Sequence, residues 1–402
     1  MKTCGLIVEY NPFHNGHVYH IQEAKKQTNA DCMIAVMSGS FLQRGEPAIM
    51  DKYHRTKAAL SMGIDLVLEL PYAYAVQNSD LFAKGAVQTL NAVHTDAICF
   101  GSESGHIEPF QETYKQMQTH SDLYQSILKT ELNKGEAFPK AHEKAFYQLP
   151  KGNKDNFLDL SAPNNILGYS YLKEILDHNL PIEPITIKRT KSGYHDTSIH
   201  GEIASATAIR ESILNTKEIP KSTMPHSTYT QLMEYEQKTN QLHNWEVYFP
   251  FLQYRVLTMS LDELSEIHGM DEGLEYRMKQ TARHAQSLAD WIEKIKSKRY
   301  TWTRIQRLFT HLLTNTKKSE IHSIKKMSHP NYVRILGMNN TGRQYVNTYK
   351  NNISLPIITS YSKNQSSLLS IEERASHSYY SILSPEIKKM LYQQELSGPI
   401  LI

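Results

Sequence analysis

The fold of this chain is decided by the stretch Gly5-Leu6-Ile7-Val8-Glu9-Tyr10-Asn11-Pro12-Phe13-His14-Asn15-Gly16-His17. Its first four residues are a short apolar run, typical of a strand that is buried on both faces. The segment Val18 to Thr28 places Ile21 and Ala24 on one side and polar side chains on the other, which predicts a helix. The polar residues 9–17 therefore form the turn between a buried strand and a helix.

The same rhythm of strand and helix continues through the first half of the chain. The pattern predicts further strands at Cys32–Met37, Leu66–Leu70, Ala97–Phe100 and Pro184–Ile187, and helices at Asp51–Met62, Phe82–Val93 and Ile203–Leu214. Continuous apolar strands that alternate with helices indicate a parallel sheet covered on both faces. A polar segment rich in Gln and Lys, at about residues 106–160, interrupts the rhythm and predicts a helical insertion.

Beyond about residue 219 the rhythm is lost and helical patterns dominate. They predict helices at Trp245–Leu257, Leu261–Ile267, Gly273–Lys296 and Thr301–Leu313, while the tail from Tyr332 mixes short apolar runs with turns. The sequence thus predicts an α/β protein in two parts. Residues 1–218 form a Rossmann-like parallel-sheet domain with the helical insertion, and residues 219–402 form a mainly helical C-terminal domain.

Composition narrows the functional class. The formal net charge of the 402 residues is only +3, so whole-chain charge does not indicate a nucleic-acid binder. The three cysteines are scattered and form no C-x-x-C pair, which argues against a disulfide scaffold and a structural zinc site, and we predict no protein-bound metal. No run reaches the ~18 apolar residues of a membrane span. We expect a cytoplasmic protein that does not engage a membrane, and its oligomeric state stays open.

The turn between the first strand and helix carries candidate chemistry. Ligands bind open α/β sheets at the carboxyl ends of the strands, where a helix N-terminus offers free N–H groups to phosphate. His14 and His17 lie three residues apart and would point to the same side, and Gly16 permits close approach of backbone. The alternative is a glycine-containing turn with two surface histidines.

A second group of candidates stands in Ile203-Ala204-Ser205-Ala206-Thr207-Ala208-Ile209-Arg210, at the start of a later helix. The hydroxyls of Ser205 and Thr207 can cap the helix and donate to phosphate, and Arg210 can pair with phosphate oxygens in a planar fork. The alternative is an ordinary helix cap beside a surface arginine.

Single residues near other strand ends are further candidates for the nucleotide. Gly101 follows the fourth strand, Asn164 stands at a predicted helix start, and Arg189 lies just beyond the strand Pro184–Ile187. We expect backbone at Gly101 to face the adenosine, and the Asn164 amide and Arg189 to reach the nucleotide. Plain turn chemistry and a solvated basic loop are the alternatives.

The loop that follows the second strand reads Met37-Ser38-Gly39-Ser40-Phe41-Leu42-Gln43-Arg44-Gly45-Glu46-Pro47. It is long and polar, and it lies at the same edge of the predicted sheet, where loops carry substrate. Ser40, Gln43 and Arg44 are candidates for holding a small carboxylate. A mobile surface loop is the alternative.

Together these segments resemble a known family. The strand followed by N-P-F-H-N-G-H is the signature of the HIGH-type (HUP) nucleotidyltransferases, and A-S-A-T-A-I-R resembles their I-S-S-T-x-x-R motif with one serine replaced by alanine. The further blocks M-S-G-S-F-L-Q-R-G-E-P-A-I, F-G-S-E and P-N-N-I-L-G make the first half similar to bacterial tRNA-Met cytidine acetate ligases.

The resemblance implies a two-step reaction with ATP, Mg²⁺ and acetate. Acetyl-adenylate and pyrophosphate form first, and the acetyl group then moves to N4 of the wobble cytidine of elongator tRNA-Met, which gives N4-acetylcytidine and AMP. It implies that the catalytic residues are His14, His17, Ser205, Thr207 and Arg210. The implied ATP-binding residues are Ile7, Val8, Glu9, Tyr10, Asn11, Pro12, Phe13, His14, Asn15, Gly16, His17, Val18, Tyr19, His20, Gly101, Asn164 and Arg189.

A basic stretch with interleaved aromatics, Arg277 to Lys326, is the candidate surface for RNA. Lys298, Arg299, Arg304 and Arg307 are its candidate contacts, and a solvated helix face is the other interpretation. Two other functions stay open: a nucleotidyltransferase acting on a small metabolite, and a nucleotide-sensing or RNA-binding scaffold without catalysis.

Overall fold

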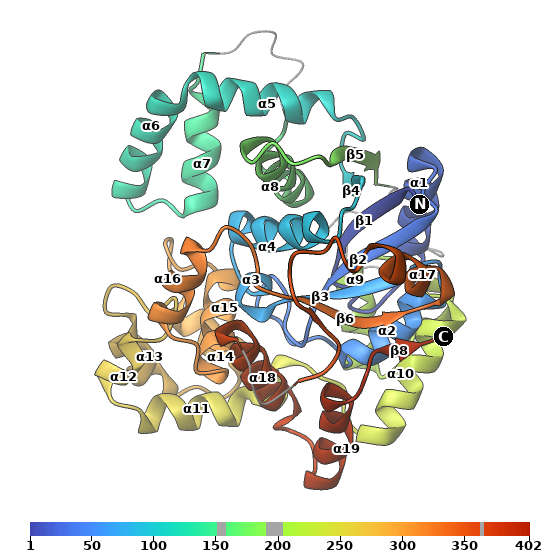
Figure 1. Cartoon of the computed structure of the whole chain (residues 1–402). Helices are drawn as coiled ribbons and strands as arrows, with labels where there is room; N and C mark the ends of the chain where they lie inside the picture. The colour runs from blue at the N-terminus through green and yellow to red at the C-terminus, as the bar shows by residue number, and fades with distance from the viewer. Residues whose placement is uncertain (151–157, 190–203, 362–365) are drawn as a thin grey trace.

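A single twisted sheet organises the molecule (Figure 1). The computed structural model describes residues 1–150, 158–189, 204–361 and 366–402. In these residues the strands run in the order β5-β4-β1-β2-β3-β6-β7, and β8 pairs with β6. Their bounds are β1 Thr3–Val8, β2 Cys32–Ser38, β3 Leu66–Leu70, β4 Ala97–Ser102, β5 Glu183–Lys188, β6 Val333–Met338, β7 Ile357–Ile358 and β8 Ile400–Leu401. The five strands from the first half are parallel, as the continuous apolar runs predicted.

Helices cover both faces of the sheet because side chains alternate along each strand. Leu6 of β1 packs with Ile21 of α1 (Asn15–Thr28), whereas a Cβ on its neighbour Gly5 would lie 2.7 Å from Leu90 of α4 (Ser79–Ala92). Helix α2 (Lys52–Leu60) joins α1 on its face, and α8 (Pro163–Asp177) and α17 (Asn340–Tyr349) join α4 on the other.

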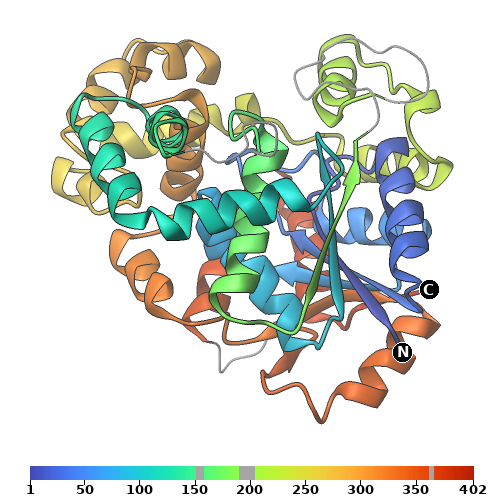
Figure 2. The same cartoon turned by 90° about the horizontal axis from the view of Figure 1, so that it is seen from above.

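The segment for which an insertion was predicted holds three helices, which project away from the sheet (Figures 1 and 2). They are α5 (Glu108–Thr119), α6 (Ser121–Asn133) and α7 (Phe138–Tyr147). Their buried side chains, among them Phe110, Leu128 and Phe146, belong to the same core as one face of the sheet, which Phe110 reaches through the ring of Phe100 in β4. The α/β rhythm resumes with α8 and β5, and the short helix α9 (Ala206–Glu211) follows.

The next hundred residues are helical, with one difference from the predicted pattern. The helices are α10 (His226–Thr239), α11 (Phe249–Thr258), α12 (Leu261–Ser265), α13 (Leu274–Ala282), α14 (Leu288–Ile295), α15 (Trp302–Leu313) and α16 (Lys318–Lys326). The prediction of a single helix over residues 273–296 was wrong, because the structure has two helices there, α13 and α14. Ser287 is an N-cap whose hydroxyl accepts from the Asp290 N–H, so α14 begins anew there.

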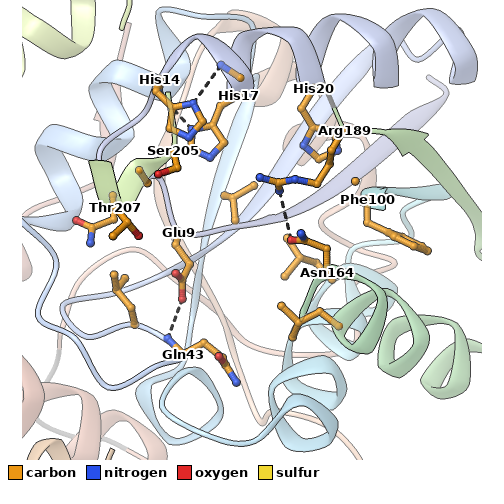
Figure 3. Close-up of a pocket in the computed structure, with 18 of the residues that line it drawn as sticks. Glu9, His14, His17, His20, Gln43, Phe100, Asn164, Arg189, Ser205 and Thr207 are labelled. Carbon is orange, nitrogen blue, oxygen red and sulfur yellow. Dashed lines mark hydrogen bonds between the residues drawn. The ribbon is translucent and has the colours of Figure 1, made fainter. Parts of the chain in front are cut away.

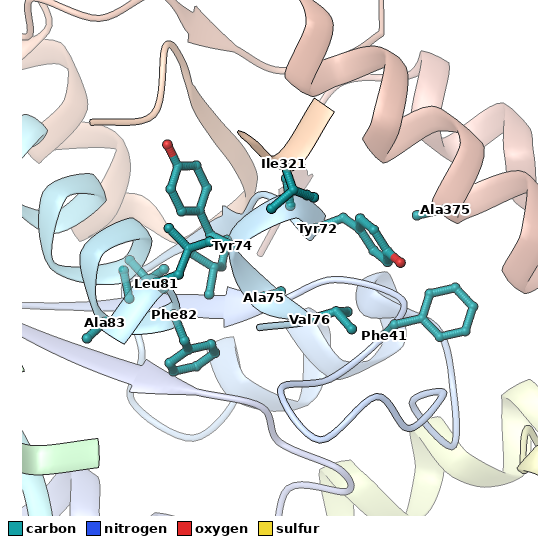
Figure 4. Close-up of a cluster of buried hydrophobic side chains, with 14 of the residues drawn as sticks. Phe41, Tyr72, Tyr74, Ala75, Val76, Leu81, Phe82, Ala83, Ile321 and Ala375 are labelled. Atoms are coloured by element: carbon teal, nitrogen blue, oxygen red, sulfur yellow. The ribbon is translucent and has the colours of Figure 1, made fainter. Parts of the chain in front are cut away.

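The tail returns to the sheet, although residues 219–402 were predicted to form a mainly helical domain. Strand β6 pairs antiparallel with β3, with Leu66 opposite Met338, and carries β7 and β8 on its far side. Helix α3 (Tyr72–Ala75), which follows β3, packs against α18 (Ser367–Tyr380) of the tail. Figure 4 shows Tyr72, Phe41, Ile321 and Ala375, from distant parts of the chain, in the core around it. The division at residue 218 remains a prediction, but the sheet itself extends across it.

The last helix, α19 (Pro385–Leu396), brings Glu395 into a buried ionic cluster beneath the sheet. Lys52 Nζ lies 2.6 Å from Glu69 and 3.0 Å from Glu395, and Arg334 of β6 bridges the same two carboxylates at 2.8 and 2.7 Å. The cluster ties β3 and α2 to β6 and α19. Among the helices that the structure describes, none is long and apolar enough to cross a bilayer.

Candidate active site

A cavity of about 280 Å³ opens where the carboxyl ends of β1, β4 and β5 meet the start of α1 (Figure 3). It gathers residues from distant parts of the chain that were predicted as site residues. Those that line it are Ile7, Val8, Glu9, Asn11, His14, Gly16, His17, Tyr19, His20, Gln43, Arg44, Gly101, Asn164, Arg189, Ser205, Thr207 and Arg210. The sheet edge therefore joins the predicted nucleotide motifs and the predicted substrate loop in one place.

Six of the residues predicted to bind ATP or acetate do not line this cavity: Tyr10, Pro12, Phe13, Asn15, Val18 and Ser40. Tyr10 and Phe13 are buried and hold the His17 ring by edge and tilted contacts, with ring centroids 4.9 and 5.5 Å away. The Asn15 amide donates to the Ser222 carbonyl instead. Ser40 is 2% exposed, and the turn of its loop buries it away from the cavity.

Backbone N–H donors decide which ring nitrogen carries the proton in the two histidines of the turn, His14 and His17. The Gly16 N–H donates to His14 Nδ1 at 3.0 Å, and the His14 N–H donates to His17 Nδ1 at 3.1 Å. Because each Nδ1 accepts, the proton of each neutral ring sits on Nε2. The rings stack with centroids 3.7 Å apart. The pair thus presents two N–H donors fixed by the start of α1.

Burial keeps these rings neutral. It lowers the pKa of His14 to about 3, with Arg189 and Arg210 adding to the effect, and it lowers the pKa of His17 well below its usual value. A third ring, His20, also lines the cavity, and burial together with Arg189 lowers its pKa to about 4. Its Nε2 is buried without a hydrogen-bond partner in the described part of the chain. Neutral rings can donate to an anion without first taking up a proton.

Gly16 has a steric role in this arrangement. A Cβ there would lie 2.8 Å from Cε1 and 3.0 Å from Nδ1 of the His14 ring. The ring can therefore rest against the start of α1 only because residue 16 has no side chain.

Arg189 and Asn164 form one wall of the cavity (Figure 3). The Arg189 guanidinium donates to Asn164 Oδ1 at 3.3 Å, and the Asn164 amide donates to Glu103 at 2.8 Å. The Arg189 side chain also lies over Gly101, where a Cβ would come 3.1 Å from its Cγ. The three residues predicted at separate strand ends are thus neighbours.

Arg210 and Ser205 reach the cavity from α9. Arg210 donates to the Asn11 carbonyl at 2.9 Å and pairs with Glu46 at 2.9 Å. Ser205 is the N-cap of α9, and its hydroxyl accepts from the Ala208 N–H at 3.0 Å. In this structure the carboxylate of Glu46 occupies the anion-binding side of Arg210.

Glu9 and the loop predicted to carry substrate are joined by hydrogen bonds in the cavity. The Gln43 N–H donates to Glu9 Oε1 at 2.7 Å, and the Gln43 amide donates to the Gln77 carbonyl at 2.8 Å. Burial raises the pKa of Glu9, against the hydrogen bond from Gln43. The loop is therefore fixed against the first strand rather than free in solvent.

Sequence reasoning missed part of the cavity. The missed residues are Leu42, Glu46, Phe82, Phe100, Leu167, Tyr171, Ile187, Lys188 and Ala206. Phe100 and Ile187 lie near the ends of predicted strands, so their positions held a signal, and Glu46 lay within the loop already singled out. Phe82, Leu167 and Tyr171 come from helix faces, where an apolar residue gives no sign that it borders a ligand. They add an apolar wall, in which the rings of Phe100 and Tyr171 lie 5.8 Å apart.

The predicted RNA contacts lie outside this cavity, and they differ in the groups with which they pair. Lys298 pairs with Glu136 at 3.1 Å, Arg299 with Glu272 at 2.5 Å and Arg304 with Asp271 at 3.4 Å. Arg307 instead donates to the Gln77 carbonyl at 3.3 Å, and burial, then Arg304 and Arg44, lower its pKa to about 10. Within the described ranges no group of three or more His, Cys, Asp or Glu side chains could hold a metal.

The fold and cavity are those of an α/β nucleotidyltransferase, with fixed donors at the start of the first helix. In agreement, the family model described as HIGH Nucleotidyl Transferase matches residues 1–395. The tRNA(Met) cytidine acetate ligase of Oceanobacillus iheyensis is 53% identical over 405 residues, which cover 100% of both chains. That of Bacillus subtilis is 43% identical over 383 residues, covering 94% of this chain and 92% of the relative.

Solved structures agree. The apo structure of Thermotoga maritima TmcAL is 34% identical in sequence, with a TM-score of 0.92. The structure of TmcAL bound with alpha-thio ATP is 33% identical, with a TM-score of 0.89. Each match covers 100% of both chains. The chain belongs to the tRNA(Met) cytidine acetate ligase family of HIGH nucleotidyltransferases. The resemblance seen in the motifs and the predicted α/β nucleotidyltransferase fold are confirmed.

Proposed function

We propose that this chain is an ATP-dependent ligase that activates acetate as acetyl-adenylate and transfers the acetyl group to N4 of the wobble cytidine of elongator tRNA-Met. The observation that carries the proposal is the neutral pair His14 and His17, with both Nε2–H groups fixed at the edge of the sheet. The family of its relatives supports the acetate and tRNA assignments. Such an enzyme acts in the cytoplasm, where its tRNA is.

In this proposal the triphosphate lies at the start of α1. His14 and His17 donate to it through Nε2, and Arg210, Ser205 and Thr207 approach it from α9. The adenosine lies against Gly101 and the apolar wall of the cavity, with Asn164 and Arg189 at its edge. The neighbouring contacts of Arg189, Asn164 and Gly101 support this placement.

Acetyl-adenylate forms when an acetate oxygen attacks the α-phosphorus and pyrophosphate leaves. Charge builds on the leaving group, and fixed N–H donors stabilise such charge without reorganisation. We propose that Gln43 and Arg44 of the loop, which line the cavity, hold the acetate carboxylate. The hydroxyl of Ser40 is buried elsewhere and has no part in this proposal.

In the second step N4 of the cytidine attacks the acetyl carbonyl carbon and AMP leaves. Cytidine N4 is a weak nucleophile, so positioning next to the mixed anhydride supplies much of the rate. Mg²⁺ commonly bridges triphosphate oxygens. The cavity carboxylates Glu9 and Glu46 already engage Gln43 and Arg210, so we propose that Mg²⁺ is held chiefly through the nucleotide.

A small-metabolite nucleotidyltransferase is the second candidate, since the cavity alone would serve it equally well. The test is exchange of labelled pyrophosphate into ATP, with and without acetate and without tRNA. We expect exchange that requires acetate. Exchange that proceeds with another small acceptor, and not with acetate, would favour the metabolite transferase.

The basic residues Lys298, Arg299, Arg304 and Arg307 remain proposed RNA contacts. Three of them are paired with acids in the free chain, so an RNA phosphate must displace or share those partners. Reversing the charge of Arg304 and Arg307 together should weaken binding of tRNA, and unchanged affinity would place the RNA surface elsewhere.

A further inference from the structure

Glu9 directly follows β1 and lines the cavity with its carboxyl group. In Figure 3 it lies between the histidines of the turn and Gln43. Its Oε1 atom accepts from the Gln43 N–H at 2.7 Å, whereas its Oε2 atom accepts from no donor in the described part of the chain. One oxygen is therefore anchored, and the other is open to a ligand in the cavity.

The surroundings of Glu9 make its carboxylate a better proton acceptor than an exposed one. Burial is the largest influence and raises its pKa, and Glu46 adds to that effect. The Gln43 N–H, Arg44 and Arg210 act in the opposite direction, but none of the cations described in the structure forms an ion pair with Glu9. A carboxylate whose pKa is raised toward the working pH is suited to general base catalysis.

The other basic groups that line the cavity are less suited to take up a proton. His14 and His17 already accept through Nδ1 and carry their protons on Nε2. Burial, the largest cause, lowers the pKa of His20 to about 4, so its ring holds a proton only weakly. Glu46 pairs with Arg210 at 2.9 Å, and such a partner favours the charged carboxylate.

The second step of the proposed reaction releases a proton. When N4 of the cytidine attacks the acetyl carbonyl carbon, a C–N bond forms and N4 gives up one of its hydrogens. The bond from that carbon to the phosphate oxygen breaks, and its electron pair leaves with AMP. A general base for this step has to lie within hydrogen-bond reach of N4. Glu9 is anchored by Gln43, which belongs to the loop proposed to hold the acetyl group.

We propose that Glu9 is the general base of the transfer step, which takes the N4 proton on Oε2 while the Gln43 N–H holds Oε1. The inference rests on the proposed function and deepens it, because it gives the second step a catalytic residue of its own. The proton passes from Glu9 to solvent once AMP and the acetylated RNA have left. The histidines serve the first step as donors, so the two steps use different side chains of the same turn.

The test separates the two steps in the full-length protein. Acetate-dependent exchange of labelled pyrophosphate into ATP, without tRNA, reports the first step. Protein preincubated with ATP, Mg²⁺ and labelled acetate is then mixed with unmodified elongator tRNA-Met, and the appearance of labelled N4-acetylcytidine reports the transfer. Glu9→Gln keeps an acceptor for the Gln43 N–H but cannot take up the proton, so transfer should fall about 10²-fold or more relative to exchange. Glu46→Gln, which removes the other cavity carboxylate, should keep the wild-type ratio of transfer to exchange.

The dependence of transfer on pH distinguishes a base from a residue that only holds the loop. The wild-type transfer rate should rise with pH until Glu9 is ionised and then level off. Glu9→Asp should keep this rise at a lower rate, and Glu9→Gln should lose it. The charged and titratable groups that act on Glu9, or on which it acts, are Glu46, Arg44, Arg210, Arg55 and Tyr171.

Three results would overturn the role of Glu9. They are equal losses of exchange and transfer in Glu9→Gln, a rise with pH that persists in Glu9→Gln, and an equal fall of the transfer-to-exchange ratio in Glu46→Gln. A wild-type protein without acetate-dependent exchange would instead contradict the proposed function, and the role of Glu9 with it.

Discussion

His14 and His17 show how backbone can set the chemistry of a side chain. Two N–H groups of the turn and of α1 occupy the Nδ1 atoms, so the ring protons are left on Nε2. Burial removes the charged form, because an imidazolium in this place would be desolvated beside Arg189 and Arg210. Two histidines that would titrate in water thus become fixed neutral donors.

This arrangement predicts the effect of Gly16→Ala. The new Cβ would overlap the His14 ring at 2.8 Å and displace it from the start of α1. We expect acetate-dependent pyrophosphate exchange to fall by about 10²-fold or more, the scale for losing a fixed transition-state donor. Urea unfolding should show a change in stability within about 1 kcal/mol, since alanine is the better helix residue. Exchange at the wild-type rate would contradict the proposed role of the ring.

At the scale of elements, the loop 39–47 links the cavity proposed to bind ATP to the helical part of the chain. On one side it meets Glu9 through Gln43, and Arg210 through Glu46. On the other side the Gly45 carbonyl accepts from the Thr310 hydroxyl of α15 at 2.7 Å. The loop takes its shape from α15 as much as from the sheet.

Gly45→Ala tests this link, with Gly135→Ala as its matched control. Both glycines have left-handed backbone, with φ of +82° and +81°, but a Cβ at Gly45 would lie 2.4 Å from the Arg307 backbone nitrogen, whereas none lies within 4 Å at Gly135. We expect Gly135→Ala to cost about 1–2 kcal/mol from backbone strain alone. Gly45→Ala should cost roughly 2 kcal/mol more by urea unfolding and should also lose pyrophosphate exchange. Equal losses of stability, with exchange retained, would show that the loop does not depend on α15.

The loop also shows which site residues could be predicted from the sequence and which could not. Its place after the second strand predicted that Gln43 and Arg44 border the ligand cavity, and they do. The same reasoning placed Ser40 there, yet Ser40 is buried. Its burial comes with the packing of the adjacent Phe41 against Tyr72, Tyr248 and Tyr379, whose ring centroids lie 5.9–6.3 Å away. Contacts between residues so far apart in the chain leave no local pattern.

At the scale of the whole molecule, the buried ionic cluster joins the first and last parts of the chain. Burial opposes ionisation of Glu395, but Lys52 and Arg334 lower its pKa to about 2. Burial and then Glu69 raise the pKa of Glu372 to about 8, against Lys52, the Tyr72 N–H and Arg334. Three carboxylates thus share two cations, and Glu372 is the one that keeps a proton.

This predicts how stability depends on pH. The folded-state pKa of Glu372 exceeds the ordinary value of 4.5, so between about pH 4.5 and 8 the folded chain binds more protons than the unfolded chain. Stability therefore falls as pH rises through that window. Glu372→Gln should remove this part of the decline, roughly 1–3 kcal/mol between pH 6 and 9. Urea unfolding of both proteins at the two pH values measures it, and identical declines would exclude Glu372 as the proton carrier.

The same cluster explains why the sheet was predicted only in part. The strands of the first half are apolar runs bounded by turns, so their ends were predicted to within one or two residues. Strand β6 carries Arg334 near its start, and a charged residue there does not indicate a buried strand. Its burial depends on Glu69 and Glu395, which lie far away in the sequence.

The most direct measurement is incubation of the protein with ATP, Mg²⁺, labelled acetate and total bacterial tRNA, followed by nucleoside analysis. We predict label in N4-acetylcytidine from elongator tRNA-Met, with one AMP formed for each acetyl group transferred. Absence of labelled tRNA together with pyrophosphate release that does not depend on acetate would contradict the ligase assignment.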